Sequence, residues 1–191
     1  MSIKIKFFEI TAPFYEMIHF SGKKKIIKSV KKEKFFNQKD RVLDLAGGTG
    51  RIAKILSWQV DEMIVLDASE EMLKQCRKKG IKCKFGVAEK IPFPDNSFDK
   101  MLIIDAFHHF QDQAQAIKEI KRVLKDGGSI FVEEVNPRSF GGFILKIAEK
   151  ILLMGSRFHS PKRFKEIFEK NGFKVEIVGC QHSFYNLIIR K

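Results

Sequence analysis

The chain has 191 residues, 44% of them hydrophobic, which suffices for one hydrophobic core and argues against two independent domains. No stretch approaches the roughly 20 apolar residues of a membrane-spanning helix, and the start lacks a signal-peptide pattern, so we expect a cytoplasmic protein. The three cysteines, Cys76, Cys83 and Cys180, form no paired motif, which argues against a disulfide framework and against a metal site.

The formal net charge is +13, and +7 of it lies in residues 1–41, where eleven Lys and Arg face four acids. Two interpretations remain open: a surface for RNA or anionic lipid, or a lysine-rich helix face in contact with solvent. The second is the commoner meaning of a lysine run, and no aromatic–glycine RNA-binding signature accompanies these lysines.

Residues 1–40 carry apolar side chains at roughly helical spacing, so we predict that they form an N-terminal helical lid. From residue 41 onward, strand-length apolar runs alternate with helical patterns, which indicates a parallel sheet with helices on both faces. The expected strands are Arg41–Ala46, Glu62–Leu66, Lys82–Val87, Lys100–Ile104, Ser129–Glu134, Lys174–Val178 and Phe184–Ile189. The expected helices are Thr49–Ser57, Ser69–Lys79, Gln113–Leu124, Phe140–Leu153 and Pro161–Asn171.

Several boundaries carry their own signals. Ser69 is expected to begin a helix, and Asp126-Gly127-Gly128 is expected to stop one. We therefore predict one α/β domain over residues 1–191, with a Rossmann-like core at 41–191 and a cap insertion at 137–158.

Residues 42–53, VLDLAGGTGRIA, form an apolar strand that breaks into glycines and resumes as a helix. Glycines permit a positive φ and leave no Cβ in the way, and the helix that follows presents free N–H groups, so a ligand can approach the backbone. The next strand ends in Asp67, whose carboxylate can accept hydrogen bonds from both hydroxyls of a ribose. The alternative is that Asp67 is a helix cap or turn residue.

Asp44 stands at the mouth of this glycine loop, where a dinucleotide would bring two phosphate charges. A carboxylate there repels a pyrophosphate but suits the ammonium and sulfonium charges of S-adenosylmethionine, which favours this methyl donor over NAD. In the alternative interpretation Asp44 only accepts hydrogen bonds from loop amides.

These patterns resemble the class I methyltransferase superfamily, and within it the branch of the ubiquinone and menaquinone C-methyltransferases, from about Ala12 to the C-terminus. Asp44 to Gly50 is similar to the family's first motif and Leu66 to Ser69 to its ribose-binding strand end. Gly86 to Asp99 is similar to a third motif, which flanks the adenine. The resemblance implies the sheet order 3-2-1-4-5-7-6 with an antiparallel seventh strand.

The resemblance also implies that S-adenosyl-L-methionine is bound and leaves as S-adenosyl-L-homocysteine. The cofactor-binding residues that it implies are Tyr15, Asp44, Ala46, Gly47, Gly48, Gly50, Asp67, Ala68, Ser69, Val87, Ala88, Glu89 and Asp105. For Tyr15, ordinary packing in the lid is an equal alternative. Val87 stands where family members commonly carry an acid that contacts the adenine amino group, so we expect affinity to be lower by about 1 to 2 kcal/mol.

Methyl transfer from a sulfonium is an in-line displacement, so the protein chiefly positions the reactants and excludes water. An acceptor hydroxyl or acidic carbon also needs a base to remove its proton. The candidates are His108 and His109, which follow the fourth strand where ligands of open α/β sheets bind, and more weakly Asp105, Glu133 and Glu134. In the alternative, one histidine packs and the other caps a helix.

The apolar face of the expected helix Phe140–Leu153 has three interpretations: core packing, a roof over an apolar pocket, or peripheral contact with a membrane surface. Its place over the carboxyl edge of the sheet favours a small apolar or aromatic methyl acceptor.

Two other functions stay open, an RNA methyltransferase and a non-catalytic S-adenosylmethionine-binding protein. The segment Asp105–His108 lacks the Asn/Asp-Pro-Pro-Tyr pattern, which disfavours methylation of nucleic-acid amino groups. The sequence identifies neither the acceptor nor the oligomeric state.

Overall fold

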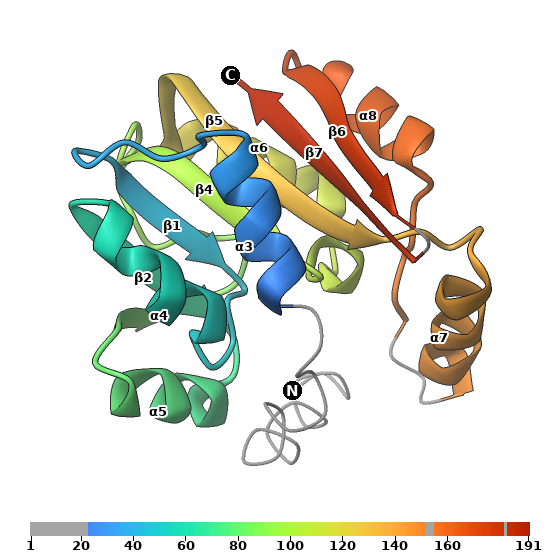
Figure 1. Cartoon of the computed structure of the whole chain (residues 1–191), viewed down its shortest axis with the longest axis horizontal. Helices are drawn as coiled ribbons and strands as arrows, with labels where there is room; N and C mark the ends of the chain where they lie inside the picture. Colours follow the sequence, from blue (N-terminus) through green and yellow to red (C-terminus); the bar gives the residue numbers. More distant parts are fainter. Residues whose placement is uncertain (1–22, 152–154, 182) are drawn as a thin grey trace.

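The computed structural model describes residues 23–151, 155–181 and 183–191, and in these residues seven strands form one sheet of order β3-β2-β1-β4-β5-β7-β6 (Figure 1). The strands β1 to β5 pair in parallel, whereas β7 runs antiparallel to both β5 and β6. The predicted order and the antiparallel seventh strand are therefore confirmed. The strands are β1 Arg41–Leu45, β2 Glu62–Asp67, β3 Lys82–Phe85, β4 Phe98–Ile104, β5 Leu124–Val135, β6 Lys174–Gln181 and β7 Phe184–Arg190.

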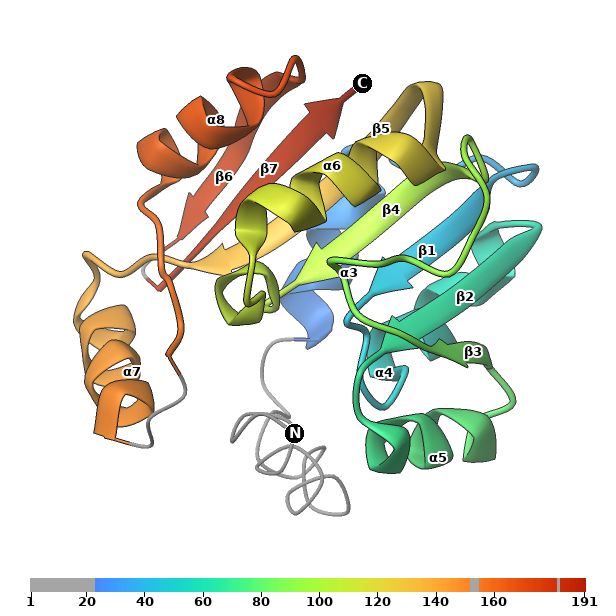
Figure 2. The same cartoon turned by 180° about the vertical axis from the view of Figure 1, so that it is seen from behind.

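Helices cover both faces of the sheet (Figures 1 and 2). They are α3 Lys23–Lys32, α4 Arg51–Leu56, α5 Glu70–Lys78, α6 Gln113–Val123, α7 Phe140–Ile151 and α8 Pro161–Glu169, with 3-10 turns η1 Ser57–Gln59 and η2 Phe107–His109. Alternate residues of β1 enter different cores, because successive strand side chains point to opposite faces. Leu43 belongs to the core on the side of α6 and α8, whereas Val42 belongs to the core on the side of α3, α4 and α5.

Side-chain caps fix where three helices begin. The Ser69 hydroxyl accepts a hydrogen bond from the Met72 N–H at the start of α5, as the sequence predicts. The Asp112 carboxylate does the same for α6, and the Ser160 hydroxyl for α8, whose first residue is a proline. A cap of this kind stabilises a helix by about 1 kcal/mol, and these caps place the loops that lead into each helix.

The prediction that Asp126-Gly127-Gly128 stops a helix is wrong. Helix α6 already ends at Val123, where Leu124 turns to an extended conformation, and β5 begins five residues before the expected Ser129. The register with β4 then jumps from the pair Phe98–Leu124 to the pair Lys100–Ser129. Gly127 adopts a φ of +76°, so the glycines accommodate an irregularity within the strand rather than a helix end.

Other boundaries differ by a few residues from those predicted. The helix expected from Thr49 begins at Arg51, because Gly50 adopts a left-handed φ of 68°, and its last turn is the separate 3-10 segment η1. Strand β3 ends at Phe85 rather than Val87, which forms an isolated bridge with Lys90. These differences leave the layout of the sheet unchanged.

The predicted lid and cap are described only in part. Residues 1–22, with Tyr15, lie outside the described residues. Helix α3 buries Ile26 and Val30 against the sheet and exposes Lys28, Lys31 and Lys32, which is the arrangement of a lysine-rich solvated face. In the cap region, α7 stands apart from the sheet (Figures 1 and 2). None of the described helices combines the length and the apolar character that crossing a membrane requires.

Candidate functional site

A cavity of about 370 Å³ opens at the carboxyl ends of β1, β2 and β4. Ligands of open α/β sheets bind at this edge, because the loops that leave parallel strands meet there. The predicted residues that line the cavity are Asp44, Ala46, Gly47, Gly48, Asp67, Ala68, Val87, Ala88, Glu89, Asp105 and His109. Gly50, Ser69 and His108 are close by in the chain but are not among the lining residues.

The glycine loop leaves no room for larger side chains. A Cβ on Gly47 would lie 2.5 Å from Oδ2 of Asp44, and one on Gly50 would lie 2.6 Å from Sγ of Cys76 in α5. The loop is thus pressed between a carboxylate and a helix, so glycines are needed there for packing as well as for access. Ala46 and Asp105, which follow β1 and β4, both adopt left-handed φ angles of 57° and 52°. Such strained residues gather at functional sites.

Asp67 ties the glycine loop to the turn after β2. Its Oδ2 accepts a hydrogen bond from the Gly48 N–H at 2.8 Å, and its Oδ1 accepts one from the Ser69 N–H at 2.8 Å. Burial raises the pKa of this carboxyl, and the amide hydrogen bonds act in the opposite direction. Asp67 therefore organises a turn and also lines the cavity; its contact with a ribose stays a prediction.

Asp44 is the most deeply buried acid of the cavity wall, with 2% of its surface exposed. Among the described residues, its Oδ2 has no hydrogen-bond partner. Burial, followed by the charge of Asp67, raises its pKa from 3.8 to about 7, and Arg51 lowers it by less. An unpartnered buried carboxylate oxygen is costly unless a ligand supplies a donor or a positive charge.

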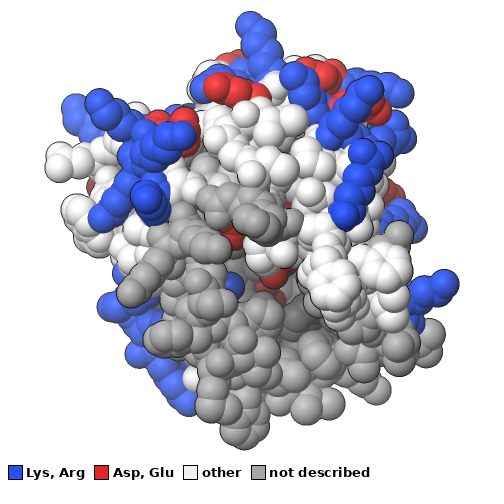
Figure 3. Space-filling view, turned by 45° about the vertical axis from the view of Figure 1, so that its right-hand side comes forward, with Lys and Arg blue, Asp and Glu red and all other residues white. Residues whose placement is uncertain are grey.

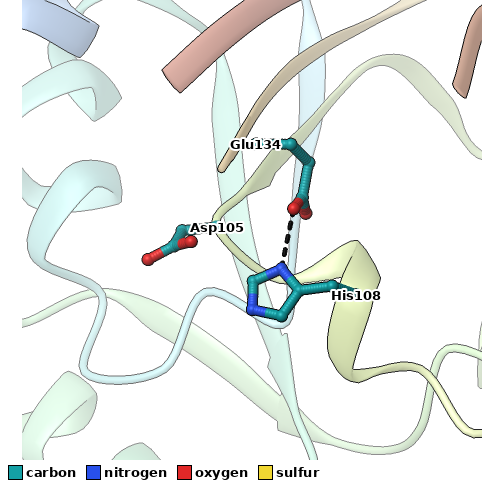
Figure 4. A group of neighbouring side chains, drawn as sticks. All are labelled: Asp105, His108 and Glu134. Atoms are coloured by element: carbon teal, nitrogen blue, oxygen red, sulfur yellow. Dashed lines mark hydrogen bonds and ion pairs between the residues drawn. The ribbon is translucent and has the colours of Figure 1, made fainter. Parts of the chain in front are cut away.

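The turn after β4 is held from the neighbouring strand. Glu134 of β5 accepts hydrogen bonds from the Ala106 and Phe107 N–H groups on Oε1, and its Oε2 lies 2.7 Å from Nδ1 of His108. Because a carboxylate only accepts, Nδ1 of His108 carries the proton in this bond. Figure 4 shows this pair with Asp105 beside it; the three side chains present ligand atoms within 4.8 Å of one another. Both oxygens of Glu134 thus clamp the turn.

The two adjacent histidines lie in different surroundings. His108 is buried, and its ring stacks on Phe158 with centroids 4.4 Å apart. His109 lines the cavity, and its Nδ1 lies 3.1 Å from the Ser156 hydroxyl. Of these two histidines, His109 lines the cavity and His108 does not.

Glu89 lines the cavity and holds the loop between η2 and α6. Its Oε1 accepts hydrogen bonds from the N–H groups of Gln111 and Asp112. Sequence reasoning missed some lining residues, notably Arg51, Met72 and Phe110. A signal was present for Arg51, which directly follows Gly50, whereas Met72 and Phe110 look like ordinary apolar residues in the chain.

Comparisons with known proteins agree on one family. The family model described as methyltransferase domain matches residues 43–132. A demethylmenaquinone methyltransferase of Thermotoga maritima is 30% identical over 162 residues, which cover 71% of each chain. The uncharacterized methyltransferase YcgJ of Bacillus subtilis is 40% identical over 105 residues, or 51% of this chain. The matched part spans only 42% of that relative's length.

Solved structures show the same fold. A crystal structure of an S-adenosylmethionine-dependent methyltransferase from Thermotoga maritima has a TM-score of 0.79 and 26% identity, over 96% of this chain and 98% of that one. The complex of DhpI with S-adenosylhomocysteine has a TM-score of 0.76 over 98% of this chain and 95% of that one. At 18% identity, this second likeness concerns the fold alone.

Proposed function

Because the chain belongs to the class I S-adenosylmethionine-dependent methyltransferases, in the branch of the ubiquinone and menaquinone methyltransferases, we propose that it methylates a small apolar or aromatic acceptor. S-adenosylmethionine, when bound, supplies a methyl group that its sulfonium already activates. The contribution of the chain is to bind, to orient and to exclude water. We further propose a single domain, with residues 1–40 as a lid and 137–158 as a cap.

The observation that carries this proposal is the pair of carboxylates at the ends of β1 and β2, of which Asp44 is buried and Asp67 half-buried. Asp44 and Asp67 both line the cavity, and Oδ2 of Asp44 has no partner among the described residues. A cationic nucleoside fits this wall, whereas a pyrophosphate would meet two acids. Asp67 would hold the ribose, and Asp44 would face the positively charged methionine end. Val87, Ala88 and Glu89 would flank the adenine.

The acceptor side of the cavity supports an apolar substrate. Ile104, Ala106 and Phe110 contribute apolar wall beside His109. A similar protein is named a demethylmenaquinone methyltransferase, which is consistent with an aromatic acceptor. Where that acceptor loses a proton, His109 is the proposed base, because histidine titrates near neutrality and this side chain lines the cavity.

Calorimetry with S-adenosylmethionine and S-adenosylhomocysteine tests the proposal. Asp67→Ala is expected to weaken binding by about tenfold or more, through loss of the ribose contacts. The matched control is Asp61→Ala, an exposed acid directly before the other end of β2, which should bind like the unchanged protein. Equal affinity of Asp67→Ala and Asp61→Ala would contradict the role of Asp67. Production of S-adenosylhomocysteine over a panel of small aromatic acceptors then tests turnover.

A further inference from the structure

Helix α7 exposes an apolar face. The exposed fractions of Phe140, Phe143, Ile144 and Ile147 are 82%, 56%, 51% and 44%. These positions are spaced i, i+3, i+4 and i+7, so they fall on one side of the helix. Such a face normally packs into a core, and an exposed contiguous one marks an interaction site. Core packing, one of the three sequence-based interpretations, therefore does not describe these four side chains.

The α7 face is linked to the cavity by the segment that follows the helix. The Arg157 N–H donates to the His108 carbonyl at 2.8 Å, and the Ser156 hydroxyl lies 3.1 Å from Nδ1 of His109. Phe158 stacks on His108 in the same turn. The cap region that carries the apolar face is thus attached directly to the turn that lines the acceptor side of the cavity.

The described surroundings of the α7 face are positively charged. Arg138 precedes the helix, Lys150 lies in its last turn and Arg157 follows it, and all three are exposed. By sequence, residues 137–158 carry four Lys and Arg and one acid, Glu149, which gives this segment a formal net charge of +3. Figure 3 brings this side of the molecule forward and shows Lys and Arg beside part of its uncharged surface. A partner that is apolar and negatively charged complements this combination.

The size of the face argues against a second copy of the chain. A helix of 12 residues is about 18 Å long and about 10 Å wide, so its face covers a few hundred Å² at most. A stable protein interface needs roughly 800 Å² on each partner. An anionic bilayer has no such requirement, because a narrow apolar stripe enters the acyl boundary while neighbouring cations remain at the phosphates.

We propose that α7 docks the protein on an anionic lipid bilayer, with its apolar face in the acyl boundary and Arg138, Lys150 and Arg157 at the headgroup phosphates. The inference deepens the proposed function and rests on it in one respect: docking brings the acceptor side of the cavity to the bilayer, from which an apolar acceptor can enter. Lipid binding itself requires neither methyl donor nor acceptor.

Flotation of the full chain with phosphatidylglycerol–phosphatidylcholine vesicles tests docking. The Phe143→Ser/Ile147→Ser variant is expected to lose about tenfold or more of the bound fraction relative to free protein. Ile147→Ser alone should lose less. The matched control is Ile177→Ser on β6, because Ile177 and Ile147 are both 44% exposed; this control should float like the unchanged protein. Pure phosphatidylcholine vesicles and high salt should each lower binding.

Equal flotation of the double variant and the unchanged protein would overturn the proposal. A lipid-independent dimer that the same substitutions abolish, seen by light scattering, would also overturn it. Circular dichroism on every variant verifies folding independently of ligand binding. If the double variant does not fold, the comparison of Ile147→Ser with the unchanged protein decides. Vesicle binding without binding of the methyl donor would overturn the proposed function alone. Binding of the methyl donor without vesicle binding would overturn docking alone.

Discussion

The Asp67 carboxylate holds two loops in place and also lines the cavity. Its two oxygens accept the Gly48 and Ser69 N–H groups, and the same side chain lines the cavity. The sequence shows why Asp67 and Asp44 meet, since the carboxyl ends of two parallel strands lie at one edge. It does not show the protonation of Asp44, because a pKa of about 7 depends on burial and on the approach of Asp67 in three dimensions.

Val87 offers a test at the level of one side chain. It lines the cavity and exposes 38% of its surface, at the position where family members resembling this chain commonly carry an acid. Val87→Asp would restore a hydrogen bond to the adenine amino group, so we expect affinity for S-adenosylmethionine to rise about tenfold in calorimetry. Val87→Ala controls for the loss of the apolar side chain. Affinity that stays equal or falls in Val87→Asp would contradict the placement of the adenine.

The turn after β4 places His108 and His109 in different surroundings, although the sequence predicts the same role for both. In a 3-10 turn, successive residues are rotated by about 120°, so His108 and His109 of η2 point to different places. Two adjacent residues carry no periodicity from which this difference could be predicted. The role of Glu134 was equally hidden, because it reaches His108 from another strand, 26 residues further along the chain.

His108→Ala is expected to lower the free energy of unfolding by about 3 kcal/mol, because it removes a hydrogen bond to a buried carboxylate. Urea denaturation measures this loss. His109→Ala is the control at the neighbouring, half-buried position, where a change within about 1 kcal/mol is expected. The methylation rate should depend on the other histidine. If His109 is the base, His109→Ala should lower the methylation rate at unchanged cofactor affinity. Equal destabilisation by the two substitutions would contradict the role of the Glu134–His108 hydrogen bond in holding the turn after β4.

Element positions were predicted well where hydrophobic periodicity decides them. The strands at Glu62, Lys82 and Lys174 begin at the predicted residues, and so do the helices at Gln113 and Pro161. Predictions failed where glycine conformation decides the boundary. Gly50 delays α4 through a left-handed φ, and Gly127 lets β5 begin early through an irregular register. A glycine permits several conformations, so the sequence alone does not select one.

The protein as a whole should respond to pH through Asp44. Its pKa of about 7 in the folded state exceeds its ordinary value of 3.8, so the folded state binds more protons between these values. The free energy of unfolding should therefore fall as pH rises from about 4 to about 7, by an amount on the order of 2 to 4 kcal/mol, and the Asp44 contribution should level off above that.

Asp44→Asn isolates this contribution. In urea denaturation the variant should match the unchanged protein near pH 4 and exceed its stability at pH 8, because the buried charge is gone. Its affinity for S-adenosylmethionine at pH 8 should be lower, since the neutral amide no longer attracts a cation. Asp61→Asn, at an exposed position, should change neither quantity. A stability difference between Asp44→Asn and the unchanged protein that does not vary with pH would contradict the raised pKa.

The antiparallel direction of β7 has a practical consequence. Ser129, at the amino side of β5, pairs with Arg190, and the Lys191 N–H donates to the Gly128 carbonyl, so Lys191 lies at the edge of the sheet opposite to the cavity (Figure 1). A tether or fluorophore joined to the main-chain carboxyl of Lys191 would leave both the cavity mouth and the exposed face of α7 unobstructed. Surface-immobilised protein could then present its working side to a solution of ligands or vesicles.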